Sequence, residues 1–207
     1  MQDKFKNDKE IILEVYRSSM NQFGKTIRGI TWGSEMSQQI RFQILSDIGD
    51  VTNRKILDVG CGFGDLYWYL LKKYINISYT GIDINESAIV EAKVKYPEAR
   101  FICGDILLGC CDKQTYDFVF ASGSLGIFTP HWEEHTFEML DKMWGLSVAG
   151  MAFNFLSTYS KFRTGSKYVD PCWMFDRVCK RFSRWACLRQ EYKENDFTIY
   201  VYHNQTF

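Results

Sequence analysis

The sequence has no excess charge and no long apolar run, and both absences narrow the class of protein. Lysine plus arginine and aspartate plus glutamate each number 25, so the formal net charge is zero. Proteins that bind the phosphate backbone usually carry a strongly basic balance, which makes nucleic acid an unlikely partner. No apolar run approaches the roughly 18 residues of a membrane span, and the N-terminus, MQDKFKNDKE, is charged where a signal peptide is apolar. We therefore expect a cytoplasmic protein with no membrane partner.

Cysteine is present, but its spacing lacks the usual paired motifs. The chain has seven cysteines, an odd number, with no Cys-x-x-Cys pair, and most of them stand inside apolar segments. The disulfide frameworks of secreted proteins and most zinc sites both use paired cysteine spacings. We predict reduced thiols and no metal site.

Proline is scarce as well, and no linker divides the chain. The three prolines stand at expected element boundaries, and the sequence has neither repeats nor low-complexity stretches. A length of 207 residues is enough for one large hydrophobic core but short for two domains of ordinary size. We predict a single domain over residues 1–207, with an N-terminal helical cap over 1–50 and an α/β core over 51–207.

Hydrophobic periodicity predicts two N-terminal helices and then strands that alternate with helices. The predicted helices are 8–19, 34–48, 65–74, 86–95, 132–146 and 171–182. The predicted strands are 55–60, 78–83, 99–105, 116–123, 148–157, 186–192 and 197–203. This alternation indicates a parallel sheet. Only residues 193–196 join the last two strands, and a parallel crossover takes about a dozen residues or more, so the final strand should run antiparallel.

The segment after the first predicted strand is a glycine-rich turn. It runs from Asp58 to Asp65 as DVGCGFGD, with glycines on alternate positions. Glycine lets the backbone turn sharply and approach a ligand where a Cβ would collide, and open α/β sheets bind ligands beyond the carboxyl ends of their strands. An ordinary strand-to-helix turn is the alternative, although packing alone does not explain three alternating glycines.

The second and third predicted strands each end in a carboxylate. Asp83 lies 19 residues beyond Gly64, where a carboxylate can accept hydrogen bonds from both hydroxyls of a ribose. Asp105 stands at the same sheet edge, suited to an adenine amino group, with Ile106 covering the ring. The alternatives are a helix N-cap for Asp83, for which Asn85 competes, and a solvated loop position for Asp105. These residues indicate a nucleoside-bearing cofactor.

Asp65 argues against a dinucleotide. The dinucleotide fingerprint is G-x-G-x-x-G, whereas this chain has G-x-G-x-G followed by Asp65. A carboxylate at a helix N-terminus would repel a pyrophosphate bound there. The turn therefore favours a cofactor without phosphates.

Four segments of the chain resemble the successive motifs of class I S-adenosylmethionine-dependent methyltransferases. These segments are ILDVGCGFGDL, YTGIDINESAI, ARFICGDIL and YDFVFASGSL. The resemblance covers residues 55–128 and is specific in order and spacing. It implies S-adenosylmethionine as the cofactor. It also implies a Rossmann-like, seven-stranded, doubly wound α/β sheet that is mostly parallel and ends in an antiparallel strand.

The resemblance also implies positions for the parts of the cofactor. Asp83 would bind the ribose hydroxyls, Ile84 would pack against the adenine, and Asp105 would accept from its amino group. The positions implied near the methionine and ribose portions are Gly60, Cys61 and Gly62.

Four further positions follow from the same resemblance. Ala121 and Ser122 would line the floor below the sulfonium. Asp58 would orient the glycine turn or reach the amino group of the cofactor through water. Trp32 belongs to the segment before the second helix, which often covers the cofactor in this family, and is interpreted either as a cofactor contact or as plain packing.

The methyl acceptor is less constrained, because methyl transfer is an in-line attack that mainly requires alignment. The fourth predicted strand ends in Ala-Ser-Gly-Ser and lacks the Asn/Asp-Pro-Pro-aromatic motif of family members that methylate adenine or glutamine nitrogens. We predict transfer to an oxygen or nitrogen of a small molecule. The alternatives are an RNA or protein methyltransferase, or a non-catalytic module that binds S-adenosylmethionine.

The sequence assigns no catalytic residue, since a base is needed only if the acceptor holds a proton until late in the reaction. The acceptor pocket is expected after the fourth and fifth strands and over 158–170. Asn154, a polar residue in an apolar run, either faces this pocket or only satisfies nearby backbone groups. The candidate bases are His131, His135, Tyr159 and Asp170. A basic stripe indicates either a solvated helix face or recognition of an anionic acceptor, and consists of Arg177, Lys180, Arg181 and Arg184.

Overall fold

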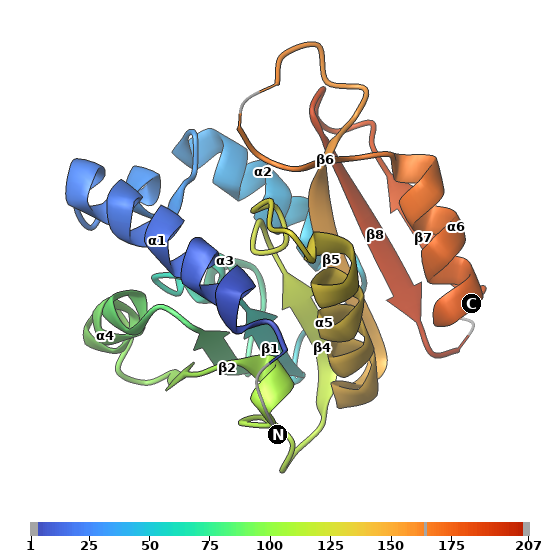
Figure 1. Cartoon of the computed structure of the whole chain (residues 1–207). Coiled ribbons are helices and arrows are strands. Elements are labelled where there is room, and N and C mark those ends of the chain that lie inside the picture. Colours follow the sequence, from blue (N-terminus) through green and yellow to red (C-terminus); the bar gives the residue numbers. More distant parts are fainter. Residues whose placement is uncertain (1–3, 164, 205–207) are drawn as a thin grey trace.

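The computed structural model describes residues 4–163 and 165–204, and a sheet of eight strands lies at its centre (Figure 1). The strands are β1 (Lys55–Val59), β2 (Ser78–Asp83), β3 (Arg100–Cys103), β4 (Tyr116–Ala121), β5 (Ser147–Ser157), β6 (Tyr168–Val169), β7 (Ala186–Arg189) and β8 (Asp196–Tyr202). Their order is β3-β2-β1-β4-β5-β8-β7, and β6 pairs with β5 outside this path. The two-residue strand β6 was not expected from the sequence.

Six α-helices and two short 3₁₀ helices surround the sheet. They are α1 (Lys6–Phe23), η1 (Ile27–Ile30), α2 (Glu35–Ser46), α3 (Asp65–Lys73), α4 (Glu86–Lys95), η2 (Ile106–Leu108), α5 (Trp132–Leu146) and α6 (Pro171–Arg181). In the described part of the chain, none of them combines the length and the apolarity that a bilayer crossing requires.

The sheet is parallel except for one strand, as predicted. The pairs between β3, β2, β1, β4 and β5 are all parallel. β8 runs antiparallel between β5 and β7, because the short connection after β7 can only form a hairpin. The fold is therefore a Rossmann-like α/β sheet whose parallel strands all end at one edge.

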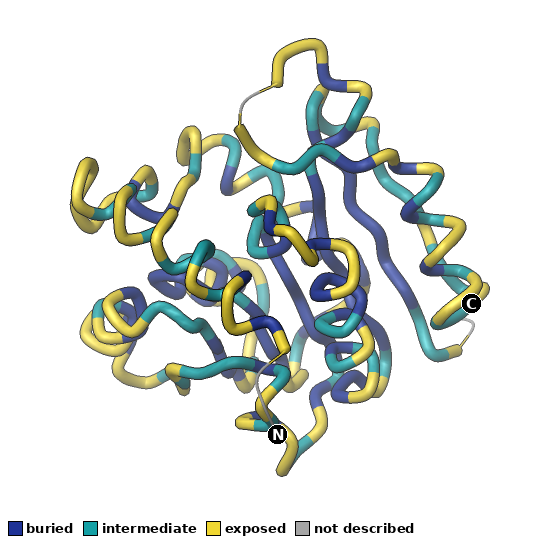
Figure 2. Tube along the Cα trace, viewed as in Figure 1, coloured by how far each residue is buried: buried dark blue, intermediate teal, exposed yellow. Residues whose placement is uncertain are grey.

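Alternation along the strands builds a core on each face of the sheet. Ile56 and Phe118 pack with α2, α3 and α4 on one face. Leu57, Val59 and Val119 pack with α5 and α6 on the other. Successive strand residues point to opposite faces, so a strand covered on both sides is apolar throughout. Figure 2 shows the central strands buried along most of their length.

Helix α1 is fixed at its N-terminal end by a buried carboxylate. Asp8 is 0% exposed, and its Oδ2 accepts hydrogen bonds from Thr129 Oγ1 at 2.9 Å and from His131 N at 3.1 Å. Its Oδ1 lies 3.2 Å from His131 Nδ1. The next residue, Lys9, forms an ion pair with Asp105, which follows β3. Helix α1 therefore runs from the start of α5 across the carboxyl ends of the parallel strands (Figure 1).

We expect Asp8→Ala to lower the free energy of unfolding by about 1–3 kcal/mol, because the buried Thr129 hydroxyl would lose its partner. Urea unfolding followed by circular dichroism measures this loss. Glu10→Ala is the matched control, since Glu10 lies on the same helix with an exposed side chain. Equal stability of the two variants would contradict the anchoring role of Asp8.

Candidate functional site

The glycine turn after β1 depends on backbone conformations that favour glycine. The φ angles of Gly60, Gly62 and Gly64 are 76°, 53° and 77°, in the left-handed region. The backbone amides of Gly60 and Cys61 both donate to Ile82 O, at 2.8 and 3.1 Å, which holds the turn against the end of β2. The turn is therefore a tight loop that leaves backbone, rather than side chains, facing the space above the sheet.

Asp83 ends β2 and holds this loop from the other side. Its Oδ2 accepts from Gly62 N at 2.9 Å, and its Oδ1 accepts from Asn85 N at 2.8 Å. Asn85, not Asp83, caps α4, because the Asn85 side chain accepts from the amides of Ser87 and Ala88. Burial raises the pKa of Asp83, and the backbone amides around the carboxylate oppose this shift. The carboxylate is held in one orientation at the strand end.

Asp58 is a buried carboxylate, and only one of its two oxygens accepts a hydrogen bond from the described residues. Its Oδ2 accepts from the Tyr79 hydroxyl at 2.6 Å, while Oδ1 has no hydrogen-bond partner among the described residues. Burial raises the pKa of Asp58 to about 7, although the Tyr79 hydrogen bond opposes the shift. A buried oxygen without a donor is unusual in a folded protein and indicates a place for a ligand.

The raised pKa of Asp58 predicts a pH-dependent stability that can be measured without any ligand. As the pH rises from about 4 to 7, an unfolded Asp58 ionises before the folded one, so stability falls over this window and the loss is complete above pH 7. We therefore expect Asp58→Asn to raise the melting temperature at pH 8 clearly more than at pH 5, since each tenfold difference in acidity between the folded and unfolded states corresponds to about 1.4 kcal/mol. Calorimetry at the two pH values measures this. Asp176→Asn, at an exposed carboxylate, should change little at either pH, and equal effects of Asp58→Asn at both would contradict the raised pKa.

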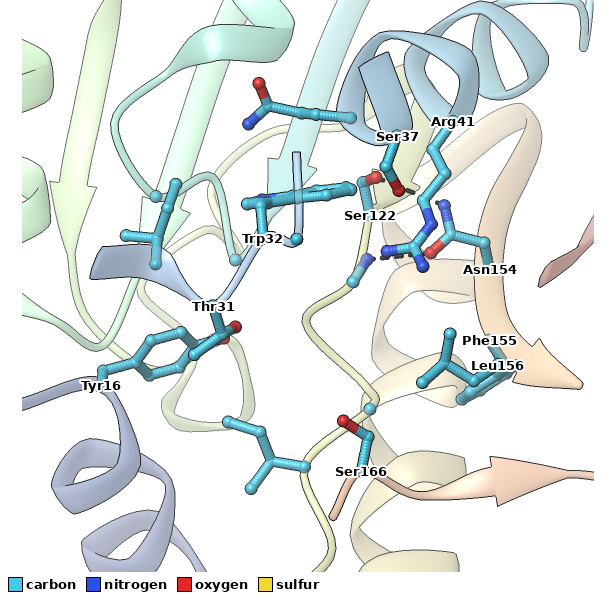
Figure 3. A pocket seen from close by; sticks show the side chains of 18 of the residues that line it. Tyr16, Thr31, Trp32, Ser37, Arg41, Ser122, Asn154, Phe155, Leu156 and Ser166 are labelled. Atoms are coloured by element: carbon cyan, nitrogen blue, oxygen red, sulfur yellow. Dashed lines mark hydrogen bonds between the residues drawn. The ribbon is translucent and has the colours of Figure 1, made fainter. Parts of the chain in front are cut away.

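A large cleft opens beside the glycine turn, with a volume of about 780 Å³. Its walls come from the Tyr16 end of α1, the segment before α2, the loops after β4 and β5, and the loop before β8 (Figure 3). Of the predicted site residues, those that line it are Trp32, Asp58, Gly60, Cys61, Gly62, Asp83 and Ser122. Ala121 is fully buried and lines neither this cleft nor the cavity described next.

A small cavity of about 60 Å³ adjoins the cleft on the side of β2 and β3. The predicted residues Asp83, Ile84, Asp105 and Ile106 line it, as does His135. Lys9, Ile12 and Tyr16 close it from the α1 side. Asp105 is already engaged there, because it accepts from Leu107 N at 2.8 Å and pairs with Lys9. The carboxylates predicted from separate strands thus lie around connected spaces.

Asn154 and Trp32 lie beside the segment where the chain leaves β4. Asn154 in β5 accepts from Gly123 N at 2.9 Å and donates to Ser122 Oγ at 3.3 Å (Figure 3). Trp32 lies beside them, with its ring centre 4.8 Å from the Arg41 guanidinium carbon. The sequence left open whether Trp32 contacts the cofactor or only packs, and whether Asn154 faces the pocket or only satisfies backbone groups. The structure places both on the wall of the large cleft, and Asn154 also binds the Gly123 amide.

The structure also contains an ion pair at the cleft that the sequence did not predict. Arg41 from α2 and Asp196 at the start of β8 form two hydrogen bonds, of 3.0 and 2.5 Å. They stand 155 positions apart, so no local pattern connects them.

None of the four candidate bases is among the residues that line the large cleft. His131 is bound to Asp8, and His135 lines the small cavity instead. Tyr159 is exposed, and Asp170 caps α6 by accepting from Trp173 N at 2.8 Å.

The basic stripe on α6 is mostly neutralised. Arg177 pairs with Glu133, Lys180 with Asp176, and Arg181 with Asp141. These exposed pairs fit a solvated helix face better than a site for an anionic acceptor.

Comparisons with known proteins agree with this geometry. The family described as "Methyltransferase domain" matches residues 56–143. A putative methyltransferase of Mycobacterium tuberculosis is 33% identical over 156 residues, covering 70% of this chain and 91% of that protein. A trans-aconitate 2-methyltransferase of an Enterobacter species is 32% identical over 88 residues, or 42% of this chain, and the match spans only 32% of that enzyme.

Solved structures with low sequence identity share the fold. The magnesium protoporphyrin IX methyltransferase of Synechocystis PCC 6803 with bound S-adenosylmethionine has a TM-score of 0.69 at 17% identity, covering 94% of this chain and 97% of that one. A plantazolicin methyltransferase in complex with a pentazolic desmethyl analogue and S-adenosylhomocysteine has a TM-score of 0.67 at 15% identity, covering 99% and 100%.

Proposed function

The chain belongs to the class I S-adenosylmethionine-dependent methyltransferases, and we propose that it transfers the methyl group of that cofactor to an oxygen or nitrogen of a small-molecule acceptor. The observation that carries the proposal is the large cleft beyond the glycine turn. Its volume of about 780 Å³ lies in the range of small-molecule sites, and it adjoins the cavity lined by the predicted adenosine residues. The similar structures named above act on a porphyrin and on plantazolicin, which also favours a small acceptor.

We propose that the small cavity marks the place of the adenosine portion of the cofactor. Its volume of about 60 Å³ corresponds to roughly two water molecules, so α1 has to move outward to admit the nucleoside. Asp83 already accepts one backbone amide on each oxygen, which leaves a lone pair on each for the two ribose hydroxyls. Ile84 and Ile106 would contact the adenine, whose amino group would donate to Asp105. Lys9 already forms an ion pair with Asp105, so the adenine amino group must displace Lys9 or share the carboxylate with it.

The methionine portion of the cofactor would lie along the glycine turn and the end of β4. The fit rests on Asp58, whose buried and unpartnered Oδ1 can accept from an ammonium group, directly or through water. Gly60, Cys61 and Gly62 offer backbone rather than bulky side chains along the same wall. Burial raises the pKa of the Cys61 thiol, so it stays protonated and acts only by packing.

The bound cofactor supplies an electrophilic methyl group on a sulfonium, and the protein supplies alignment. Asn154 fixes Gly123 and Ser122 and thereby shapes the floor beside which the acceptor would lie. The aromatic side chain of Trp32 covers the same region from the α2 side. Alignment of donor and acceptor accounts for much of the barrier in reactions of this kind.

Two measurements test the proposed function. Titration calorimetry should show binding of S-adenosylhomocysteine to the full chain, and absence of binding would overturn it. The chain is then incubated with methyl-labelled S-adenosylmethionine and, in separate reactions, a small-molecule extract, bulk tRNA or denatured protein. We expect label only in the small-molecule reaction. Label in tRNA or protein would replace the proposal by a macromolecular acceptor.

A further inference from the structure

The large cleft carries a positive group on its far wall. Asp196 is 0% exposed and accepts from Arg41 Nε at 3.0 Å and from Arg41 Nη2 at 2.5 Å. Lys193 Nζ lies 2.8 Å from the same carboxylate and donates to Ser37 Oγ at 2.5 Å. Two cations therefore share one buried carboxylate, and the cluster keeps one net positive charge.

One nitrogen of Arg41 remains available to a ligand. Nε and Nη2 bind Asp196, while Nη1 has no hydrogen-bond partner among the described residues. A Cβ built on Gly123 would lie 3.7 Å from Nη1, which places that nitrogen beside the end of β4. Figure 3 shows Arg41 reaching from α2 into the cleft beside Trp32. The side chain is held in position by Asp196 and by the indole, so its unused donor is fixed before any ligand binds.

This donor lies on the side of the cleft away from the proposed adenosine cavity. In the sheet order, β1 with its glycine turn is followed by β4, β5 and β8, and Asp196 begins β8. Gln38, one helical turn before Arg41, faces the glycine turn instead and donates to Asp65 at 3.3 Å. Arg41 therefore belongs to the acceptor half of the large cleft.

In the described part of the chain, the same half contains no histidine and no carboxylate that could act as a base. Among the described residues, the lining carboxylates of the large cleft are Asp58, Asp65 and Asp83, all on the cofactor side. Lys193 is held as a cation beside Asp196, and burial raises the pKa of Tyr16, so its phenol stays protonated. An alcohol or an ammonium would have to lose a proton to become a nucleophile, whereas a carboxylic acid is already ionised near neutral pH. Apolar walls from Ile127, Phe155 and Leu156 would contact the rest of such a molecule.

We infer that the acceptor is a carboxylic acid bound as its anion at Arg41 Nη1, and that the carboxylate itself is methylated. A lone pair on one carboxylate oxygen forms the new O–CH₃ bond as the S–CH₃ bond breaks, and that bonding pair stays on sulfur. The sulfonium becomes a neutral thioether, the acid becomes a methyl ester, and no proton is transferred. Arg41 is a specificity-determining residue, because it binds the acid and loses its charged partner once the neutral ester forms.

The inference rests on the proposed function and is tested with defined acids. Octanoate, benzoate and indole-3-acetate, and the methyl ester of each, are titrated into the full chain saturated with S-adenosylhomocysteine. At least one acid should bind tenfold or more tightly than its ester. Arg41→Gln should weaken binding of that acid at least tenfold and leave the affinity for S-adenosylhomocysteine within twofold. With labelled S-adenosylmethionine, the product should release labelled methanol in alkali, as methyl esters do.

The outcomes distinguish a carboxylate of the acceptor from the carboxylate of the cofactor as the ligand of Arg41. A wild-type protein that binds S-adenosylhomocysteine but prefers none of the acids to its ester overturns the inference and leaves the proposed function intact. Loss of S-adenosylhomocysteine binding in Arg41→Gln also overturns it, since Nη1 would then serve the carboxylate of the cofactor. Lys193 remains beside Asp196 in this variant, and thermal unfolding checks its fold. Arg41→Lys is the second variant. It keeps the positive charge but lacks the planar guanidinium group with its paired donors, and it should weaken acid binding at least fivefold.

Discussion

Replacing Asp83 by alanine is expected to lower the affinity for S-adenosylhomocysteine at least 100-fold. The carboxylate would accept two ribose hydroxyls, and hydrogen bonds to charged groups contribute about 1.5–3 kcal/mol each. The substitution also removes the acceptor that holds Gly62 N at 2.9 Å, so the glycine turn loses its support from β2. Titration calorimetry of the purified variant measures the affinity, and circular dichroism establishes that the fold is retained.

Two further variants make the result specific. Asp83→Asn keeps the shape and one acceptor oxygen, so it should lose less affinity than the alanine variant. Glu86→Ala removes an exposed carboxylate three positions along and should leave the affinity unchanged. If Asp83→Ala binds S-adenosylhomocysteine within threefold of the wild-type affinity, the assignment of Asp83 to the ribose is wrong.

Gly60→Ala is expected to have the largest effect on the fold, lowering the free energy of unfolding by about 3 kcal/mol or more. A Cβ on Gly60 would lie 2.2 Å from Ser124 Cβ and 2.9 Å from its Oγ, far inside van der Waals contact. Rotation of the Ser124 side chain would not relieve the contact, because the backbone fixes its Cβ, and its hydroxyl also donates to Val59 O at 2.8 Å. The φ of 76° adds backbone strain for any residue with a side chain. Urea unfolding measures the loss.

The matched control is Gly126→Ala, where a Cβ would meet only Gly123 O at an ordinary 3.6 Å. This variant should be close to the wild type in stability. The double variant Gly60→Ala/Ser124→Gly removes the clash but keeps the φ strain, and should recover part of the lost stability. A Gly60→Ala protein as stable as Gly126→Ala would show that the turn is not sterically constrained.

The sequence predicted the parts of the fold that local patterns determine. The helices 86–95 and 132–146 and the strand 78–83 have the predicted boundaries, because capping residues, periodicity and turn residues mark their ends. The antiparallel final strand followed from the length of one connection, and the family from the order of four short motifs. Each element boundary and each single motif is encoded within a dozen neighbouring residues.

Contacts between distant segments were not predictable in the same way. Asp8 and Thr129 are 121 positions apart, and Arg41 and Asp196 are 155 apart, so neither pair leaves a pattern in a local window. His131 could be interpreted as a base only because its partner Asp8 was unknown. β6 escaped prediction since a strand of two residues forms only where β5 offers it an edge.

The position of α1 has a consequence for the speed of the enzyme. Lys9, Ile12 and Tyr16 close the cavity proposed for adenosine, and Lys9 occupies the carboxylate that the adenine would use. With adenosine in this cavity, cofactor exchange would require this helix to lift, and the spent cofactor would leave no faster than the helix lifts. We expect a turnover limited by product release, with a burst of methylated product in the first cycle when labelled cofactor and acceptor are mixed rapidly with the enzyme.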